Sequence, residues 1–452
     1  MALRGTYRQR HPENSAFFQC LESYWPEFRE TYPYFFEKEY GPLRPVVEKT
    51  VERFLDCGIY HNGFARVRCT TCRHEYLLAF SCKTRYFCPS CQSKRVAAFV
   101  EWVTTAILEP VDHRQMVWTI PKVLRPTFRR ERHLLGELVR CAWKTLQDYI
   151  QSQFETETAC GAVFAIQTWG DQLNFHPHNH SLVSDVAWDR AGNALAIEWS
   201  DSSVLTRLFQ HHVLEMLIRE HRLSPEFAHK LRLWHHSGFQ VWVGRPVPPE
   251  DQKSLERLCA YILRPSFAST RLHYDSDQGQ IEYETKKGVQ RSMDALDWIA
   301  LVTSHIPNPQ QQTVRYYGRY SNASRGKRRK QALGFSAIHS VESSGQDSPC
   351  ERFAHQRRRN WARLLQKIYE VDPLTCPCGG QMEIIAFIEQ PAAIRKILQH
   401  LKLWDRPQRS PPRRLFPHKL ENFLETLSPR QAQQIKASTD TLFWEDVPIF
   451  EG

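Results

Sequence analysis

Three histidines at alternate positions are the residues of this sequence whose spacing points most directly to chemistry. The run NFHPHNHSLVSD places His176, His178 and His180 two residues apart, so in an extended segment all three imidazoles project from one face. Neutral imidazole nitrogens suit a divalent cation, and an ion held there could polarise a phosphate oxygen. The alternative is a polar loop of solvated histidines, but the strand-like LVSDVAW that follows argues against it. The pattern therefore predicts a metal site on a strand.

A further metal ligand would have to come from a neighbouring segment. Gln167 lies in the preceding strand-like run AVFAIQTWG, and a short hairpin could bring it beside the histidines. Asp171 and Asp185 are alternatives that neither spacing nor composition separates from Gln167. Because carboxylates are sparse here, the sequence disfavours a two-metal nuclease, which usually needs several of them.

A tyrosine downstream is a candidate nucleophile. The segment SLERLCAYILRPSF has apolar residues at helical spacing, and its helix should end before Pro265, with Tyr261 and Arg264 in the last turn. A tyrosine hydroxyl is a weak nucleophile that needs a polarised phosphorus and nearby positive charge, which a metal ion and Arg264 could supply. Its attack on DNA would leave a 5′-phosphotyrosine and a free 3′-hydroxyl. The alternative is a core tyrosine on an amphipathic helix.

Two pairs of cysteines predict a structural zinc site. Cys69 and Cys72 form one Cys-x-x-Cys pair, and Cys88 and Cys91 form a second one 15 residues later. Four thiolates at this spacing suit one tetrahedral zinc ion and leave no open position for chemistry. The intervening EYLLAFSCKTRYF combines strand-like alternation with basic side chains, as in a zinc ribbon held against DNA phosphates.

The remaining clustered cysteines are harder to assign. Cys57, His61 and Cys82 could form a second, poorer metal site or simply pack in the core. Cys376 and Cys378 resemble half of a zinc ribbon, but no partner ligands are evident near them in the sequence. Cysteines of a tight turn without metal are therefore the favoured interpretation of that pair.

A second group of tyrosines lies among arginines in VRYYGRYSNASRGKRRK. Aromatic side chains interleaved with cations are typical of surfaces that stack the bases and contact the phosphates of single-stranded DNA. A packed strand followed by a solvated basic loop is the alternative. The candidate DNA-binding residues are Arg315, Tyr316, Tyr317, Arg319, Tyr320, Lys327, Arg328 and Arg329.

Charge and composition agree with a nucleic-acid partner. The 452 residues carry a net charge of +11 and a pI near 9.0, which favours a polyanionic partner. The 13 cysteines are an odd number in a chain with no export signal, so metal ligation is favoured over a disulfide framework. No apolar run reaches the roughly 18 residues that span a bilayer, so we expect a cytoplasmic protein that does not bind membranes.

The elements that must position these residues predict an α+β fold with an antiparallel sheet. We expect a helical lead-in and zinc-ribbon-like module over residues 1–96, a central sheet domain with flanking helices over 97–335, and a mainly helical basic region over 350–452. The segment 340–349 is the best linker candidate. Strands are expected at 114–121, 162–170, 178–189 and 239–243, a hairpin at 271–285, and helices at 130–154, 203–222 and 249–263.

Several motifs together resemble the HUH transposases of rolling-circle insertion sequences, both the two-tyrosine type and the single-tyrosine common-region relatives. The matching landmarks occur in the family's order between about Cys57 and Lys330: CTTC with SCKTRYFCPSC, VWTIPKVLR, QTWGDQLNFHPHNHSLV, YILRPSF and RYYGRYSN. A weaker continuation follows at DPLTCPCGGQMEIIAFI. In this family a hydrophobic residue separates the paired histidines, whereas this chain has Asn179 there.

The resemblance implies an amino-terminal zinc-binding domain that helps to recognise the element, followed by an HUH domain that uses magnesium or manganese. It assigns the nucleophile to Tyr261. Some members have a second tyrosine four residues away on the same helix, but this chain has Arg257 and Pro265 at those positions, which favours a single-tyrosine mechanism. The expected function is a nucleoid-associated transposase that nicks and rejoins single-stranded DNA of its own element and target.

Two other functions fit some of the same features. A rolling-circle replication initiator or relaxase would use the same tyrosine and metal chemistry on a plasmid origin. A zinc-dependent DNA-binding protein without catalysis would use the cysteine pairs and basic segments alone.

Overall fold

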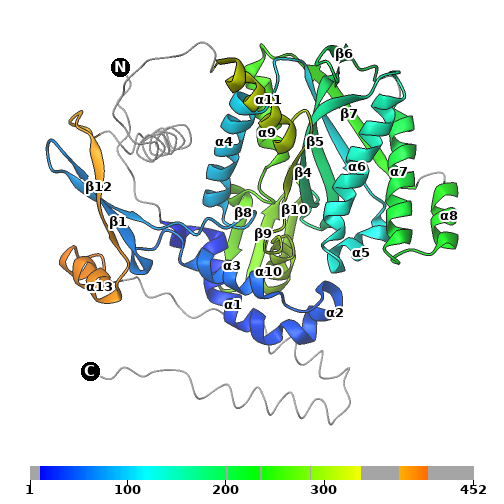
Figure 1. The fold of residues 1–452 in the computed structure, drawn as a ribbon. Coiled ribbons are helices and arrows are strands. Elements are labelled where there is room, and N and C mark those ends of the chain that lie inside the picture. The colour runs from blue at the N-terminus through cyan, green and yellow to red at the C-terminus, as the bar shows by residue number, and fades with distance from the viewer. Residues whose placement is uncertain (1–10, 200–201, 235–236, 286, 337–375, 406–452) are drawn as a thin grey trace, which may run out of the picture.

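Three antiparallel sheets organise the chain in a computed structural model that describes residues 11–199, 202–234, 237–285, 287–336 and 376–405 (Figure 1). The largest sheet has the strand order β11-β4-β5-β3-β7, and a short β6 pairs with β5. Its strands are β3 (His113–Thr119), β4 (Thr158–Trp169), β5 (Phe175–Asp189), β6 (Ala194–Ala196), β7 (Gln240–Val247) and β11 (Val314–Gly318). The predicted α+β class with a central antiparallel sheet is confirmed.

Both faces of the main sheet are covered by helices, which explains why β4 and β5 are buried along most of their length. Because side chains alternate along a strand, Phe164 and Val183 pack against α6 (Leu134–Gln151) and α7 (Ser202–Arg219). On the opposite face, Ala165 and Leu182 share a core with α9 (Gln252–Ile262). Figure 1 shows α6 and α7 on one side of the sheet and α9 on the other.

The opening helices pack on the same core as α9. Helix α1 (Ala16–Phe35) begins at Ser15, whose hydroxyl accepts a hydrogen bond from the Phe18 amide. The Phe17 ring lies 5.1 Å from the Phe87 ring and 4.7 Å from the Phe267 ring, measured between centroids. The lead-in is therefore joined to the central domain by a shared aromatic core.

The second sheet and its neighbouring helices complete this half of the molecule. The sheet has the order β10-β9-β8, and its β8–β9 hairpin is the one predicted at 271–285. Helices α1 and α10 contact this sheet. The elements are α2 (Glu37–Tyr40), α3 (Pro45–Leu55), β8 (Leu272–Asp275), β9 (Gln280–Glu284), β10 (Gln290–Asp294) and α10 (Ala295–Ser304).

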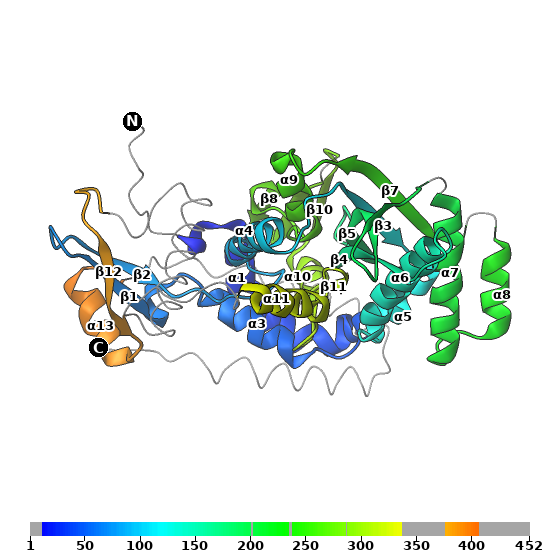
Figure 2. The ribbon, with the colours of Figure 1, turned by 45° about the horizontal axis from the view of Figure 1, so that its top comes forward.

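The third sheet joins two segments that lie far apart in the sequence. Strand β1 (Phe64–Cys69) pairs with β2 (Glu75–Ala79) on one side and with β12 (Met382–Ile388) on the other. Together with α13 (Pro391–His400) these strands form an arm at one end of the described chain (Figure 2). Of the region 350–452, which was expected to be mainly helical, the structure describes residues 376–405, and these contain α13 together with the strand β12 that completes the amino-terminal sheet.

The other described helices are α4 (Pro89–Ala106), α5 (Arg125–Arg130), α8 (Pro225–Leu233) and α11 (Asn322–Ser336), with 3-10 turns η1 (Pro12–Asn14), η2 (Tyr60–Asn62), η3 (Lys122–Leu124) and η4 (Ser269–Arg271). The basic run RGKRRK lies in α11 rather than in the solvated loop considered as its alternative. The linker candidate at 340–349 lies outside the described residues.

Among the helices that the structure describes, none combines the length and apolar character needed to cross a bilayer.

Candidate active site

Two of the three alternate histidines face each other on strand β5. His178 and His180 are 6% and 2% exposed, and their Nε2 atoms lie 3.1 Å apart. The Nδ1 atom of His178 lies 2.7 Å from the His176 carbonyl oxygen, an arrangement that puts the proton on Nδ1 and leaves the Nε2 lone pair directed at its neighbour. Burial, followed by the charges of His176 and Arg264, lowers the pKa of His178 to about 3. His178 is therefore neutral at physiological pH, as a metal ligand must be.

The separation of the two Nε2 atoms fits a shared divalent cation. Two nitrogens bonded to one ion at about 2.1 Å and separated by 3.1 Å subtend roughly 95° at the ion. That angle is close to the right angle between neighbouring positions of an octahedron, the geometry that magnesium and manganese prefer. His178 and His180 thus fit the cation that the sequence predicts.

Gln167 lies beside this pair but uses its amide to hold a helix. Its Cα is paired with that of His178 across β4 and β5, and its side chain is fully buried. The amide nitrogen donates to the carbonyl oxygens of Tyr261 and Ile262 at 3.3 and 3.0 Å, and the amide oxygen accepts from Arg264 Nε at 3.3 Å. These contacts fix the carboxyl end of α9 against the sheet.

The other suggested ligands lie less favourably. The buried Nε2 atom of His176 has no hydrogen-bond partner within the described chain, but no third His, Cys, Asp or Glu of the described residues forms a ligand group with His178 and His180. Asp185 is paired with Arg114 through two hydrogen bonds. Asp171 is exposed in the turn that follows β4.

The tyrosine predicted as nucleophile packs directly on the histidine pair. Asp251 caps the start of α9 by accepting a hydrogen bond from the Ser254 amide, and the helix ends with Tyr261 in its last turn, 39% exposed. The Tyr261 ring meets the His180 ring edge to face, with centroids 5.2 Å apart. The Arg264 guanidinium carbon lies 4.4 Å from the centre of the tyrosine ring. Tyr261, Arg264 and the two histidines therefore share one site.

Two further residues near this site, Gln115 and Arg125, were not predicted from the sequence. The Nε2 atom of Gln115 on β3 lies 3.1 Å from Nδ1 of His180 and so fixes the orientation of that imidazole ring. The positive charge of Arg125, at the start of α5, contributes to lowering the pKa values of His176 and His178. The sequence feature that could have indicated Gln115 is a polar residue within the otherwise apolar strand RQMVWTIP.

A buried group of four cysteines supports the same helix from the other side. The Sγ atoms of Cys57, Cys82, Cys88 and Cys91 all lie within 4.8 Å of one another, and Cys88 and Cys91 belong to the first turn of α4. The next residue, Gln92, is fully buried and donates a hydrogen bond from Nε2 to the Leu263 carbonyl oxygen at 2.9 Å, just beyond the end of α9. The four thiols match the ligand set of a structural zinc ion.

The prediction of one zinc site shared by the two Cys-x-x-Cys pairs is corrected by this arrangement. Cys69 and Cys72 lie in the arm, where their sulfurs form a second group with Cys376 and Cys378. Spacing alone could not separate the two pairs, because both turns have the same Cys-x-x-Cys form and chain distance does not reveal the partner of each. His61 belongs to neither group, since its Nε2 atom lies 2.8 Å from the Trp404 carbonyl oxygen.

Of the tyrosines proposed to stack DNA bases, one is fully buried and two are half-buried. Tyr320 is fully buried, and its hydroxyl lies 2.6 Å from Nε2 of His113. Tyr317 stacks on Trp143 with ring centroids 5.1 Å apart. Tyr316 packs edge to face on Trp102 at 5.3 Å. The structure therefore agrees with the alternative of a packed strand for these rings, because β11 is an edge strand covered by α4 and α6 side chains.

The cations of the same segment divide into internal and external groups. Arg319 and Arg328 both pair with Glu109, and Arg315 donates to the Gly136 carbonyl oxygen. Their charge thus helps to anchor α11 and β11. The side chains of Lys327 and Arg329 are exposed on α11, so among the predicted DNA-contacting residues these two remain accessible to a phosphate backbone.

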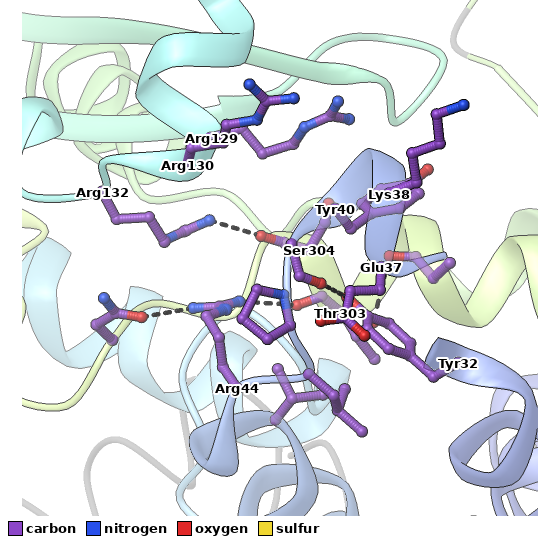
Figure 3. Close-up of a pocket in the computed structure, with 16 residues that line it drawn as sticks. Tyr32, Glu37, Lys38, Tyr40, Arg44, Arg129, Arg130, Arg132, Thr303 and Ser304 are labelled. Atoms are coloured by element: carbon purple, nitrogen blue, oxygen red, sulfur yellow. Dashed lines mark hydrogen bonds between the residues drawn. The ribbon is translucent and has the colours of Figure 1, made fainter. Parts of the chain in front are cut away.

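A basic cavity of about 380 Å³ lies apart from the tyrosine and histidine site (Figure 3). Arg44 and Arg132 reach into it, but they donate to main-chain oxygens at the carboxyl end of α10, including a 2.8 Å bond from Arg132 to the Ser304 carbonyl. Capping a helix end with arginine satisfies carbonyls that have no partner inside the helix. The two guanidinium groups therefore hold α10 in place.

Comparisons with known proteins agree with these features. Residues 161–328 match a family model described as "Putative transposase", and residues 21–120 match one described as "Transposase zinc-binding domain". This chain belongs to the IS91 family of transposases. The resemblance to HUH transposases with an amino-terminal zinc-binding domain is thus confirmed at the level of the family, and structural zinc is supported by the matched domain and the cysteine groups.

Curated relatives of the transposase point the same way. It is 26% identical to "Transposase for insertion sequence element IS801" of Pseudomonas savastanoi pv. phaseolicola, over 77% of this chain and 86% of the relative. It is 25% identical to "Putative transposase y4qJ" of Sinorhizobium fredii, over 56% of this chain and 69% of the relative. No solved structure matches the chain.

Proposed function

We propose that this transposase nicks and rejoins single-stranded DNA by tyrosine transesterification, as part of rolling-circle transposition of its own insertion sequence. The observation that carries the proposal is the packing of the Tyr261 ring on His180, 5.2 Å between centroids, beside a histidine pair with facing Nε2 atoms. A nucleophile and a cation site must be adjacent for phosphoryl transfer, because the phosphate has to be held by one and attacked by the other.

In this proposal His178 and His180 hold the catalytic cation, with His176 and Gln167 as the further candidates. A bound magnesium or manganese ion would polarise the scissile phosphate. Gln115 orients His180, and the bonds from Gln167 and Gln92 hold the end of α9 so that Tyr261 stays over the site. The Arg264 guanidinium supports the charge that develops on the phosphate oxygens.

The reaction exchanges one phosphodiester for another. The Tyr261 hydroxyl loses its proton and its oxygen bonds to phosphorus, while the bond from phosphorus to the 3′-oxygen of the preceding nucleotide breaks. That oxygen takes up a proton and leaves as a free 3′-hydroxyl, and the DNA remains attached as a 5′-phosphotyrosine. Attack of another 3′-hydroxyl on this linkage rejoins a strand and restores the tyrosine, so no external energy source is required.

The basic surface of α11 is proposed to guide the DNA strand to this site. Lys327 and Arg329 are exposed there, and the chain as a whole carries a net charge of +11. Cations on such a surface bind phosphates without reading the sequence.

Trapping of the covalent intermediate tests the proposed function. Purified protein is incubated with single-stranded DNA from the ends of its own element, with and without magnesium or manganese, and adducts are separated on denaturing gels. We expect a metal-dependent adduct that Tyr261→Phe lowers by at least about 10³-fold, because the nucleophile is lost. The matched control is Tyr149→Phe, whose hydroxyl bonds the Glu198 carbonyl on the far side of the sheet. An undiminished adduct in Tyr261→Phe would assign the nucleophile elsewhere.

A further inference from the structure

The cysteine group of the arm has the dimensions of a zinc site. The Sγ atoms of Cys69 and Cys378 lie 3.6 Å apart, those of Cys72 and Cys376 lie 3.5 Å apart, and all four are within 4.8 Å of one another. Four sulfurs around one zinc ion at about 2.3 Å are separated by about 3.8 Å when the site is tetrahedral. A disulfide requires about 2.05 Å between its sulfurs, so these distances fit a metal shell rather than two disulfide bonds.

The backbone of both turns is arranged to stabilise thiolates. The amides of Thr71 and Cys72 lie 3.4 Å from Cys69 Sγ, and the Gly380 amide lies 3.4 Å from Cys378 Sγ. Hydrogen bonds from backbone amides favour the charged form of a thiol, which is the form that binds a metal ion.

The two turns also approach each other closely at one glycine. A Cβ atom at Gly380 would lie 2.7 Å from Cys69 Sγ and 2.5 Å from Thr71 Oγ1, which is closer than unbonded atoms pack. Gly379, which precedes it, has a φ of 85°, in the left-handed region that glycine adopts without strain. The Gly-Gly sequence after Cys378 is therefore explained by the joining of the two cysteine turns.

Strand pairing aligns the turns, but the local core is small. Cys69 is paired with Met382 in the register of β1 and β12, and the Thr70 amide bonds the Gln381 carbonyl oxygen at 2.9 Å. The buried residues of this end of the arm are Val67, Cys69, Cys376 and Met382 alone among those described. The larger apolar cluster of this sheet, in which Phe64 and Leu77 pack with α13, lies apart from the cysteines. The cysteine end therefore has little apolar core of its own, and small modules of this kind are usually held by metal or disulfide bonds.

We propose that Cys69, Cys72, Cys376 and Cys378 bind a second structural zinc ion, which fastens residues 376–405 onto the amino-terminal strands of the arm. Four thiolates complete its coordination shell, so this ion stabilises structure and takes no part in the transfer of DNA. The transposase then carries two zinc ions per chain, one buried beside α9 and one in the arm. The proposal is independent of the nicking chemistry.

Zinc content per chain tests this assignment in the full-length protein. We expect two zinc ions in the wild type and one in Cys376→Ser/Cys378→Ser and in Cys69→Ser/Cys72→Ser. The matched control is Cys20→Ala, a buried cysteine of α1 outside both groups, which keeps two. If Cys376→Ser/Cys378→Ser retains the wild-type zinc content, the proposal is overturned, and the pairing of Cys69 and Cys72 with other ligands is indicated.

Zinc release from the wild type gives a second measurement that requires no variant to fold. Cys72 and Cys378 are exposed, whereas Cys57, Cys82, Cys88 and Cys91 are all buried. A mercurial thiol reagent added in steps, with a coloured zinc indicator, should release one ion per chain early and a second only on unfolding. A single ion released only on unfolding contradicts the proposal. Tyr261→Phe should give the same two-step release, because that change affects nicking alone.

Discussion

At the scale of single residues, the asparagine between the paired histidines stands out. Asn179 is fully buried on the face of the sheet opposite His178 and His180, where its strand neighbours are Ile166 and Trp118. Neither its Oδ1 nor its Nδ2 atom has a hydrogen-bond partner within the described part of the chain. A buried amide without partners costs stability, so Asn179 weakens the fold while leaving the neighbouring imidazoles in place.

We predict that Asn179→Val raises the free energy of unfolding by about 1–3 kcal/mol, because the desolvated amide is replaced by an apolar side chain that suits a strand. Urea unfolding of the two proteins at pH 7 measures the difference. Nicking of single-stranded DNA should stay at the wild-type rate, since the substituted side chain faces away from Tyr261. A loss of stability would mean that the amide is hydrogen-bonded in solution.

The sequence pattern alone could not distinguish aromatic side chains that bind DNA from those that pack in the core. The run RYYGRYSN has the composition of a DNA-stacking surface, yet Tyr320 is fully buried against His113. The periodicity of a short strand does not reveal whether both of its faces are covered. By contrast, the partial exposure of Tyr261 was predictable, because its place in the last turn of an amphipathic helix put it at a boundary between core and solvent.

At the scale of elements, the active site depends on how α9 meets the sheet. The carbonyl oxygens of Tyr261 and Ile262 belong to the last turn of the helix, where its regular hydrogen bonding ends, although the Arg264 amide lies 3.4 Å from that of Tyr261. Gln167 donates to both, and Gln92 donates to the Leu263 carbonyl oxygen. The end of the helix is thereby joined to β4 on one side and to the first turn of α4, with its cysteines, on the other.

Replacing Gln167 by leucine should uncouple this end of α9. We expect a loss of about 1–3 kcal/mol in the free energy of unfolding, because buried carbonyls and Arg264 lose their partner, and a larger relative loss of adduct formation than of DNA affinity. Gel-based adduct assays and fluorescence anisotropy with labelled single-stranded DNA measure the two effects. Gln210→Leu is the control, since its amide donates to the Leu231 carbonyl oxygen in the α7–α8 pair. Equal losses of adduct in both variants would refute a positioning role for Gln167.

The elements of the main sheet were predictable because their signals are local. Alternating or continuous apolar runs located β3, β4, β5 and β7, and the short segment between β4 and β5 indicated their hairpin. The pairing of β1 with β12 carries no such signal. About 300 residues separate the two strands, and the entropy of closing a loop changes so slowly with its length that sequence distance neither favours nor excludes a partner.

At the scale of the whole molecule, two buried neutral histidines make the stability of the fold depend on pH. His305 follows α10 and is 2% exposed, with Nε2 donating to the Leu173 carbonyl oxygen at 2.7 Å. Burial, with a smaller contribution from the charges of Arg132 and Arg44, lowers its pKa to about 3. Burial likewise lowers the pKa of His113 to about 4. Both side chains connect the main sheet to segments later in the sequence, so their protonation opposes the assembled fold.

The direction of the pH effect follows from proton binding in the two states. An unfolded histidine has a pKa near 6.5, so between about pH 6.5 and pH 3 the unfolded chain binds a proton at residue 305 that the folded chain excludes. Stability is therefore fully present above pH 6.5 and falls by about 1.4 kcal/mol per pH unit as the solution is acidified. Over the two units from pH 6.5 to pH 4.5 this one residue accounts for about 2 kcal/mol.

His305→Gln should remove that dependence while keeping a donor for the Leu173 carbonyl oxygen. We expect the variant to be less stable than the wild type at pH 7, but to lose about 2 kcal/mol less between pH 6.5 and pH 4.5. Urea unfolding at several pH values measures both quantities. His133→Gln serves as the control, because the His133 side chain is 57% exposed. A parallel loss of stability in wild type and His305→Gln on acidification would mean that His305 is protonated in the folded protein. The neutral imidazole described here, in contact with β4 and the turn that follows it, would then be incorrect.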